Sequence, residues 1–146
     1  MESHIEIREA SFEEITDIHN TVDEFDTYGS QHFKDRCQEK NCLIICASID
    51  GAPAGYLIGY DRYEDGSFYC WMTGVNPHYR KRGVLRAMMA YQETWAKKHG
   101  YSKITIKTGN TFRPMLSYLV AHGFYFAGIE QHPDIIKNKI LLEKPL

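Results

Sequence analysis

Two hydrophobic periods divide this chain into strands and helices. Residues 4–9 alternate around Ile5 and Ile7, and three later apolar runs follow with Asp50-Gly51 and Asp65-Gly66 between them. Short apolar runs joined by such turn signals are typical of hairpin-connected strands. The pattern therefore predicts one strand followed, after a gap, by a three-strand antiparallel meander. The expected strands are 4–9, 43–49, 54–60 and 68–75.

Helical spacing fills the remaining segments. Ser11 followed by Glu14 forms a capping box, and apolar residues then recur at helical spacing as far as Phe25. A second, more polar helix is expected at about 31–40. Helices at about 83–99 and 114–122 follow, with Gly100 suited to the end of the first and Pro114 to the start of the second. Three further strands are expected at 103–108, 124–129 and 135–142.

The resulting order is β-α-α-β-β-β-α-β-α-β-β. A meander combined with a β-α-β unit predicts a mixed α/β sheet. The length of 146 residues fits one domain, expected to span residues 1–146.

Composition excludes several classes of protein. The net charge is −2, so a broad nucleic-acid-binding surface is not expected. No apolar run is long enough for a membrane span, and the first residues do not form a signal peptide, which favours a cytoplasmic location. The histidines and cysteines lack metal-ligand spacing, so no metal site is expected. Reduced, buried or half-buried thiols are the simplest interpretation of Cys37, Cys42, Cys46 and Cys70.

Residues 74–89 carry the clearest chemical signal. A β-prone run ends in Asn76-Pro77, a basic loop follows, and Gly83 opens an amphipathic helix. The first N–H groups of a helix lack intrahelical partners, and the helix dipole is positive at that end. Such a helix start can hold a phosphate or pyrophosphate. The alternative is a solvated basic turn before an ordinary helix.

The stretch Val75-Asn-Pro77-His-Tyr79-Arg80-Lys-Arg-Gly83-Val-Leu85 resembles the acetyl-CoA motif of the GNAT N-acetyltransferase superfamily. The lead-in, Arg80 and Gly83 match, and Leu85 replaces a small residue. The resemblance implies an acetyl-CoA-dependent N-acetyltransferase with that family's fold, acting on a small-molecule or peptide amine. Many members form homodimers, so a homodimer is possible here. The resemblance also implies which residues contact acetyl-CoA. The implied contact residues are Thr73, Gly74, Val75, Arg80, Lys81, Arg82, Gly83, Val84, Leu85, Arg86 and Asn110.

A second segment resembles a later motif of the same family. Asn110, Gly123 and Phe124 match it, and many members carry a tyrosine four residues before that glycine, which protonates the departing thiolate. Leu119 occupies that position here, and Tyr118 precedes it by one residue, or about 100° around a helix. Tyr118 is the candidate general acid, and a packing role is the alternative.

The amine acceptor is expected at the loop between the first two helices, where the family builds this site. The candidates there are Asp26 and Tyr28, with Asp23 and Glu24 beside them. His78 and the three acids are also the candidates for a general base, and solvated surface roles compete with each. Gly74 is a candidate bulge. One face of the nearby strands is expected to line either an acceptor cleft or the core: Tyr56, Tyr69, Trp71 and Thr73.

Two other functional classes stay open at this stage. Leu85 and Leu119 are compatible with a CoA-binding module that has lost catalysis. Arg80, Lys81, Arg82 and Arg86 are compatible with a nucleic-acid-binding domain, against which the net negative charge argues. Binding of acetyl-CoA without turnover would favour the first, and steeply salt-dependent binding to DNA or RNA the second.

Overall fold

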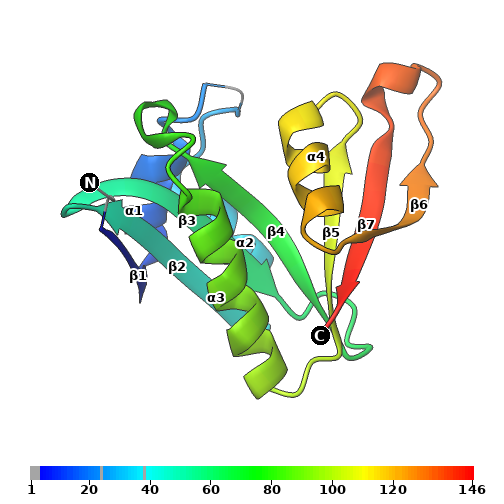
Figure 1. Ribbon diagram of the computed structural model, residues 1–146, viewed down its shortest axis with the longest axis horizontal. Helices are drawn as coiled ribbons and strands as arrows, with labels where there is room; N and C mark the ends of the chain where they lie inside the picture. Colours follow the sequence, from blue (N-terminus) through cyan, green and yellow to red (C-terminus); the bar gives the residue numbers. More distant parts are fainter. Residues whose placement is uncertain (1–3, 24, 38) are drawn as a thin grey trace.

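The protein forms one mixed sheet with helices on both faces (Figure 1). A computed structural model describes residues 4–23, 25–37 and 39–146. The elements in chain order are β1 (Ile5–Glu9), α1 (Phe12–His19), α2 (Ser30–Cys37), β2 (Cys42–Ile49), β3 (Ala52–Tyr60), β4 (Ser67–Val75), η1 (Pro77–Tyr79), α3 (Val84–Lys98), β5 (Lys103–Gly109), α4 (Arg113–Ala121), β6 (Tyr125–Glu130), η2 (Ile135–Lys137) and β7 (Lys139–Pro145). The predicted mixed α/β class and element order are confirmed.

The strands lie in the order β1-β2-β3-β4-β5-β7-β6. Neighbours are antiparallel except β4 and β5, which are parallel and are joined by α3. The chain thus builds an antiparallel meander, crosses over through α3, and completes the sheet with β5, β7 and β6. This crossover places the start of α3 beside the end of β4, where the sequence predicted an anion site.

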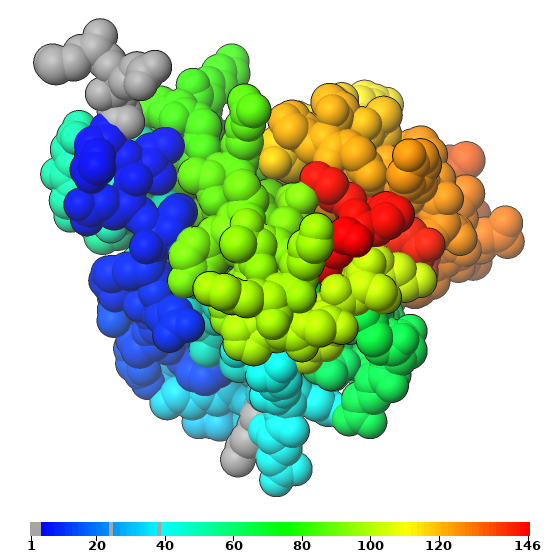
Figure 2. Space-filling view, turned by 60° about the horizontal axis from the view of Figure 1, so that its bottom comes forward, coloured from blue at the N-terminus to red at the C-terminus, as the bar shows by residue number. Residues whose placement is uncertain are grey.

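Two apolar clusters flank the sheet. The larger one lies under α3 and α4 and includes Leu57, Phe68, Met88 and Leu119, each at most 1% exposed. Figure 2 shows the outer surface of this face, with the end of β7 visible beside α3 and α4. The smaller cluster lies under α1 and α2 and includes Ile15, Phe33 and Tyr56. The cysteines are free thiols, three buried and Cys42 half-buried, as predicted.

The first helix begins as predicted but ends earlier. Ser11 Oγ accepts the Glu14 N–H at 3.2 Å. The helix stops at His19 instead of continuing to Phe25, because Thr21 donates both its backbone N–H and its hydroxyl to the Ile18 carbonyl. Val22 is nevertheless buried, with only 4% of its surface exposed. Its apolar spacing therefore reflects burial of a loop residue and not a longer helix.

The last strand also differs from its predicted position. Residues 135–137 form η2, and the strand begins at Lys139. Short polar side chains shape this connection. Asp134 Oδ1 accepts the Ile136 N–H at 3.2 Å, and Asn138 Oδ1 accepts the His132 N–H at 2.8 Å. Such local bonds compete with strand pairing.

No described helix is both long and apolar enough to cross a membrane.

Candidate functional site

The site begins where β4 and β5 separate. Their pairing runs over four residue pairs and stops at Cys70 and Ile106, although β4 continues to Val75 and β5 to Gly109. In Figure 1 the two strands meet near the C-terminus and diverge at their other ends. The facing edges beyond Cys70 therefore carry backbone donors and acceptors with no ladder partner between these two strands. Such an opening can pair with an extended ligand that carries amide groups.

A bulge in β4 lies directly at this separation. Cys70 pairs with Gly59 and Met72 with Ile58, so Trp71 is the inserted residue. Gly74 was the predicted bulge and is not, because it pairs regularly with Tyr56. The insertion reverses the alternation of faces. Tyr69 and Trp71 pack in the α1/α2 cluster, whereas Thr73 pairs with Leu57 of the opposite cluster. The expectation of one shared face was therefore wrong for Thr73.

Gly74 is needed for close packing. A Cβ atom there would lie 2.8 Å from Tyr56 Cε1, 3.1 Å from Val22 Cγ2 and 3.2 Å from Phe25 Cε2. The side chains of the loop between α1 and α2 thus rest directly on the end of β4. This contact brings the predicted acceptor loop to the strand that borders the opening.

The start of α3 has the backbone features on which the predicted anion site depends. Gly83 is the exposed N-cap with φ 85°, a left-handed conformation that favours glycine. The first intrahelical bond runs from the Ala87 N–H to the Gly83 carbonyl, so the N–H groups of residues 84–86 have no partner inside the helix. The first turn holds no acidic residue. The backbone and the helix dipole together favour an anion here.

The flanking basic residues are exposed around this helix start. Lys81 has φ 63°, and the Arg82 guanidinium lies 5.7 Å from the centre of the Tyr79 ring. Arg80 and Arg86 are exposed as well. Leu85, the departure from the expected motif, is half-buried and packs against the α3-side core. Its bulk is therefore accommodated by the core.

Tyr118 and Leu119 occupy distinct environments on α4. Leu119 is 0% exposed and belongs to the core, while Tyr118 is half-buried and stacks on His122 with ring centres 4.0 Å apart. Burial, and next the negative charge of Glu93, raise the pKa of Tyr118 to about 12, whereas Arg86 acts in the opposite direction and Cys70 adds slightly to the rise. Tyr118 packs against the α3-side core, which includes Cys70 at the last pair of β4 and β5. At neutral pH it carries its proton.

Asn110 holds the connection between β6 and β7. Its backbone N–H donates to the Asn138 carbonyl and its side-chain amide to the Ile135 carbonyl, each at 3.0 Å. The same amide was predicted to contact acetyl-CoA, and its Oδ1 atom remains as an acceptor. The observed bonds give Asn110 a structural role at the end of β5.

The loop between α1 and α2 is held by specific bonds. Asn20 uses its side-chain amide to clasp Tyr28, accepting the Tyr28 N–H at 3.1 Å and donating to the Tyr28 carbonyl at 2.9 Å. Asp23 and Asp26 are exposed and Tyr28 is half-buried. Glu24 lies outside the described residues. His78, the other candidate base, is exposed in η1.

A family model described as the acetyltransferase (GNAT) family matches residues 5–124. The chain belongs to the GNAT acetyltransferase family. This membership makes it an acetyl-CoA-dependent N-acetyltransferase. A comparison with the sequences of curated proteins finds no match.

Solved structures share this GNAT fold. The ribosomal-protein-S18-alanine N-acetyltransferase from Escherichia coli is 16% identical over 97% of this chain and 94% of that chain, with a TM-score of 0.83. An acetyltransferase from Bacillus subtilis, solved in complex with CoA, is 20% identical over 99% of both chains, with a TM-score of 0.76. The PaiA N-acetyltransferase from Thermoplasma acidophilum, solved with coenzyme A, is 15% identical over 98% of this chain and 99% of that chain, with a TM-score of 0.74. At these identities the likeness shows the fold.

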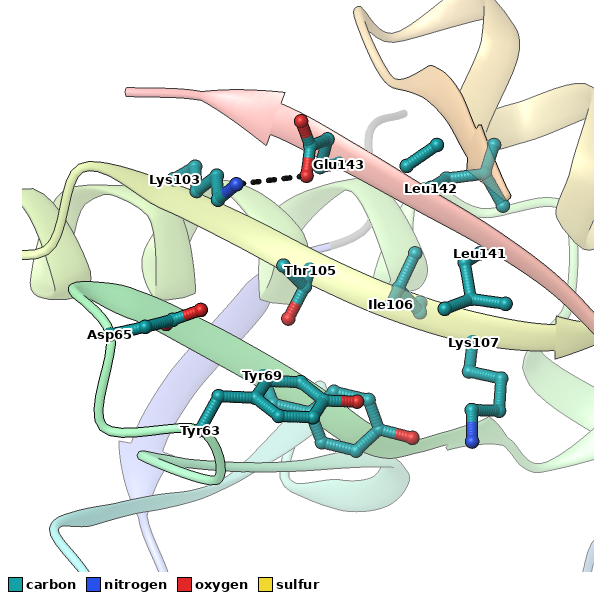
Figure 3. A pocket seen from close by; sticks show the side chains of 11 residues that line it. Tyr63, Asp65, Tyr69, Lys103, Thr105, Ile106, Lys107, Leu141, Leu142 and Glu143 are labelled. Atoms are coloured by element: carbon teal, nitrogen blue, oxygen red, sulfur yellow. Dashed lines mark hydrogen bonds and ion pairs between the residues drawn. The ribbon is translucent and has the colours of Figure 1, made fainter. Parts of the chain in front are cut away.

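The GNAT sheet also carries a pocket that the sequence did not reveal. It has a volume of about 200 Å³ and lies over the face of β4, β5 and β7 that the α1/α2 layer leaves open. Figure 3 shows Tyr63 and Tyr69 along one side and the Lys103–Glu143 ion pair, 3.0 Å long, along another. The buried hydroxyl of Thr105 in its wall has no hydrogen-bond partner among the described residues. The pocket borders the last pairs of β4 and β5.

Two features of this GNAT site were missed from the sequence. The bulge at Trp71 has no signal of its own in the alternating run 68–75. His19 is fully buried beside the predicted acceptor loop, and its position four residues after Ile15 on the apolar face of α1 was a usable signal. Among the residues that the structure describes, no group of three or more His, Cys, Asp and Glu side chains is arranged to hold a metal ion.

Proposed function

We propose that this acetyltransferase transfers the acetyl group of acetyl-CoA to a primary amine by direct attack on the thioester. The observation that carries the proposal is the opening between β4 and β5 next to the uncapped start of α3. The unpaired strand edges suit an amide-bearing arm, and the helix start suits a pyrophosphate. The residues present therefore fit the donor that the family uses.

Acetyl-CoA would lie with its pyrophosphate on the backbone of residues 80–86 and its pantetheine arm along Thr73, Gly74 and Val75. Arg80, Lys81, Arg82 and Arg86 supply positive charge around the phosphates, while Val84 and Leu85 contribute mainly their backbone N–H groups because their side chains pack inward. Backbone donors at the end of β4 would stabilise the negative charge that develops on the thioester oxygen.

The amine would approach from the side of the α1–α2 loop, since this loop rests on Gly74. The amine must first lose a proton, because a group of pKa near 10 is only about a thousandth neutral at pH 7. Asp26, with Asp23 beside it, would attract the cationic amine, and Tyr28 would form part of the wall. Tyr118 is the candidate proton donor to the departing thiolate.

A thiol-release assay with acetyl-CoA and a panel of amines tests this proposal. The panel should include polyamines, amino sugars, amino acids and peptides with free N-termini. We expect stoichiometric free thiol and acetylated amine with at least one class. Thiol release that proceeds equally without any amine would contradict transfer to an amine.

Neutralising the acidic side chains of the α1–α2 loop should raise KM for the amine and leave KM for acetyl-CoA nearly unchanged. In the double variant Asp23→Asn/Asp26→Asn we expect KM for the best amine to rise about threefold to tenfold, because exposed charges contribute about 1 kcal/mol each at most. KM for acetyl-CoA should change less than twofold. Asp35→Asn, an exposed acid on α2 outside the loop, is the matched control. Equal KM values in the double variant and the control would remove the loop from acceptor recognition.

A further inference from the structure

A buried histidine sits behind the acceptor loop. His19 ends α1 and is 0% exposed. Aromatic rings surround it, with ring centres 5.1 Å away at Phe33, 5.2 Å at Phe25 and Tyr28, and 5.6 Å at Tyr56. A polar ring enclosed in this way is costly unless both nitrogens are bonded.

The partners of His19 determine where its proton lies. Nε2 is 2.8 Å from the Asp26 carbonyl oxygen, which only accepts, so Nε2 carries the hydrogen and donates it. Nδ1 is 2.5 Å from the Tyr56 hydroxyl. In a neutral ring Nδ1 is then an acceptor, and the Tyr56 hydroxyl is its donor. The bonds thus select one neutral tautomer.

The electrostatic surroundings agree with a neutral ring. Burial lowers the pKa of His19, the bond to the Asp26 carbonyl opposes this, His32 on α2 lowers it further, and the Asp26 carboxylate raises it slightly. Tyr56 from β3 and Tyr28 from the loop are the remaining titratable groups in ring contact with it. Burial also raises the pKa of the Tyr56 hydroxyl far above its usual range, so that group keeps the proton it donates.

The bonds from Tyr56 to His19 and from His19 to Asp26 connect the α1–α2 loop to β3 and β4. Tyr56 pairs with Gly74 across β3 and β4, and its ring edge contacts the surface that Gly74 leaves open. One step away, the Asp26 carbonyl receives the His19 N–H, while Asn20 clasps Tyr28. The His19 bond is therefore one of the contacts that fix Asp26 relative to the end of β4, beside those of Val22 and Phe25 with Gly74.

We propose that His19 is a positioning residue for the amine acceptor, acting through its Nε2 bond to the Asp26 carbonyl. This inference rests on the proposed acceptor role of the α1–α2 loop. His19 touches neither substrate. It holds the loop in the shape that presents Asp26 and Tyr28 beside β4, and the Tyr56 hydroxyl anchors the imidazole ring at Nδ1.

Two amide substitutions separate the two nitrogens of His19. In His19→Gln the amide reaches about as far as Nε2 and can still donate to the Asp26 carbonyl. In His19→Asn the amide reaches only as far as Nδ1, so the bond to Asp26 is lost. We expect KM for the amine to rise about tenfold in His19→Asn and less than threefold in His19→Gln. KM for acetyl-CoA should stay within twofold in both variants.

Tyr56→Phe provides a test that preserves the ring volume. Without the hydroxyl, the buried Nδ1 loses its partner, so the ring is anchored at Nε2 alone and its bond to Asp26 is held less firmly. We expect KM for the amine to rise at least threefold, with KM for acetyl-CoA unchanged and faster amide hydrogen exchange in residues 20–23 and 25–29. If both His19 variants fail to fold, the amine KM of Tyr56→Phe tests whether the His19 bond positions the loop.

The outcomes separate this inference from the proposed function. A wild-type enzyme that acetylates no amine in the panel contradicts the proposed function, and the inference falls with it. A wild-type enzyme that is active, with an amine KM that is unchanged in His19→Asn and Tyr56→Phe, overturns the inference alone. Equal increases in both KM values, or equal effects of Asn and Gln at position 19, also overturn it, because they indicate a general structural role.

Discussion

A Gly83→Asp variant is expected to bind acetyl-CoA about a hundredfold more weakly than the wild type. Gly83 is the N-cap of α3, and the free N–H groups of residues 84–86 follow it. An aspartate there would place a negative charge beside the pyrophosphate, and a Coulomb repulsion of about 3 kcal/mol follows at a separation near 5 Å and an effective dielectric of about 20. Its carboxylate would also compete for the same N–H groups, as N-cap aspartates do.

The opposite end of the same helix supplies the control. Gly100 has φ 89°, close to the 85° of Gly83, and a Cβ there meets nothing within 4 Å. Gly100→Asp therefore imposes the same backbone strain, and it adds a charge that the dipole disfavours at this end. Titration calorimetry with acetyl-CoA should show near wild-type affinity for Gly100→Asp. Unchanged affinity in a folded Gly83→Asp variant would rule out the start of α3 as the pyrophosphate site.

The fold was predictable because local signals and burial agree along most of the chain. The capping box at Ser11, the turn at Asp50-Gly51 and the apolar face of α3 each specify an element that the tertiary structure retains. The predictions failed where burial and local structure diverge. Val22 is buried without being helical. The β-prone residues from Ile135 onward begin in η2, because Asp134 and Asn138 bond to the backbone of this connection.

The donor side of the site was predictable for a similar reason. A glycine before a helix, after a basic loop, is a local arrangement, so residues 80–86 could be proposed as the donor site from sequence alone. The acceptor side depends on contacts between distant segments. The bulge at Trp71 appears only in the register between β3 and β4, and the His19–Tyr56 bond joins residues 37 positions apart. No single-sequence pattern encodes that pairing.

The departures from the family motif have different consequences. Leu85 and Leu119 both pack against or within the α3-side core, so neither residue indicates a lost donor site. Leu85 therefore gives no reason to expect a non-catalytic module, and Leu119 leaves Tyr118 as the candidate acid. Tyr118 is different, because it lies one position away from the expected acid and yet is the phenol whose pKa responds to Glu93, Arg86 and Cys70. It packs against the α3-side core, to which Cys70 at the end of the β4–β5 pairing also belongs.

Tyr118→Phe is therefore expected to lower kcat at least about tenfold and to leave KM for acetyl-CoA nearly unchanged. The leaving thiol resembles a free cysteine of pKa about 8.5, so it can depart as the thiolate. We therefore expect a proton donor to contribute about tenfold to a hundredfold, below the usual range of general acid catalysis. Phenylalanine keeps the stacking on His122, so packing should survive. A loss confined to kcat indicates an interaction made in the transition state.

The pH dependence sharpens this test. Because the pKa of Tyr118 is raised to about 12, the phenol keeps its proton in the range where the amine acceptor loses one. The ratio of wild-type to Tyr118→Phe kcat should therefore be constant between about pH 7 and pH 10, although both rates rise as the amine is deprotonated. Tyr125→Phe, at a side chain 66% exposed on β6, is the control for loss of a hydroxyl. If kcat of Tyr118→Phe stays within about twofold of that control while chemistry limits the rate, Tyr118 is a packing residue and water protonates the thiolate.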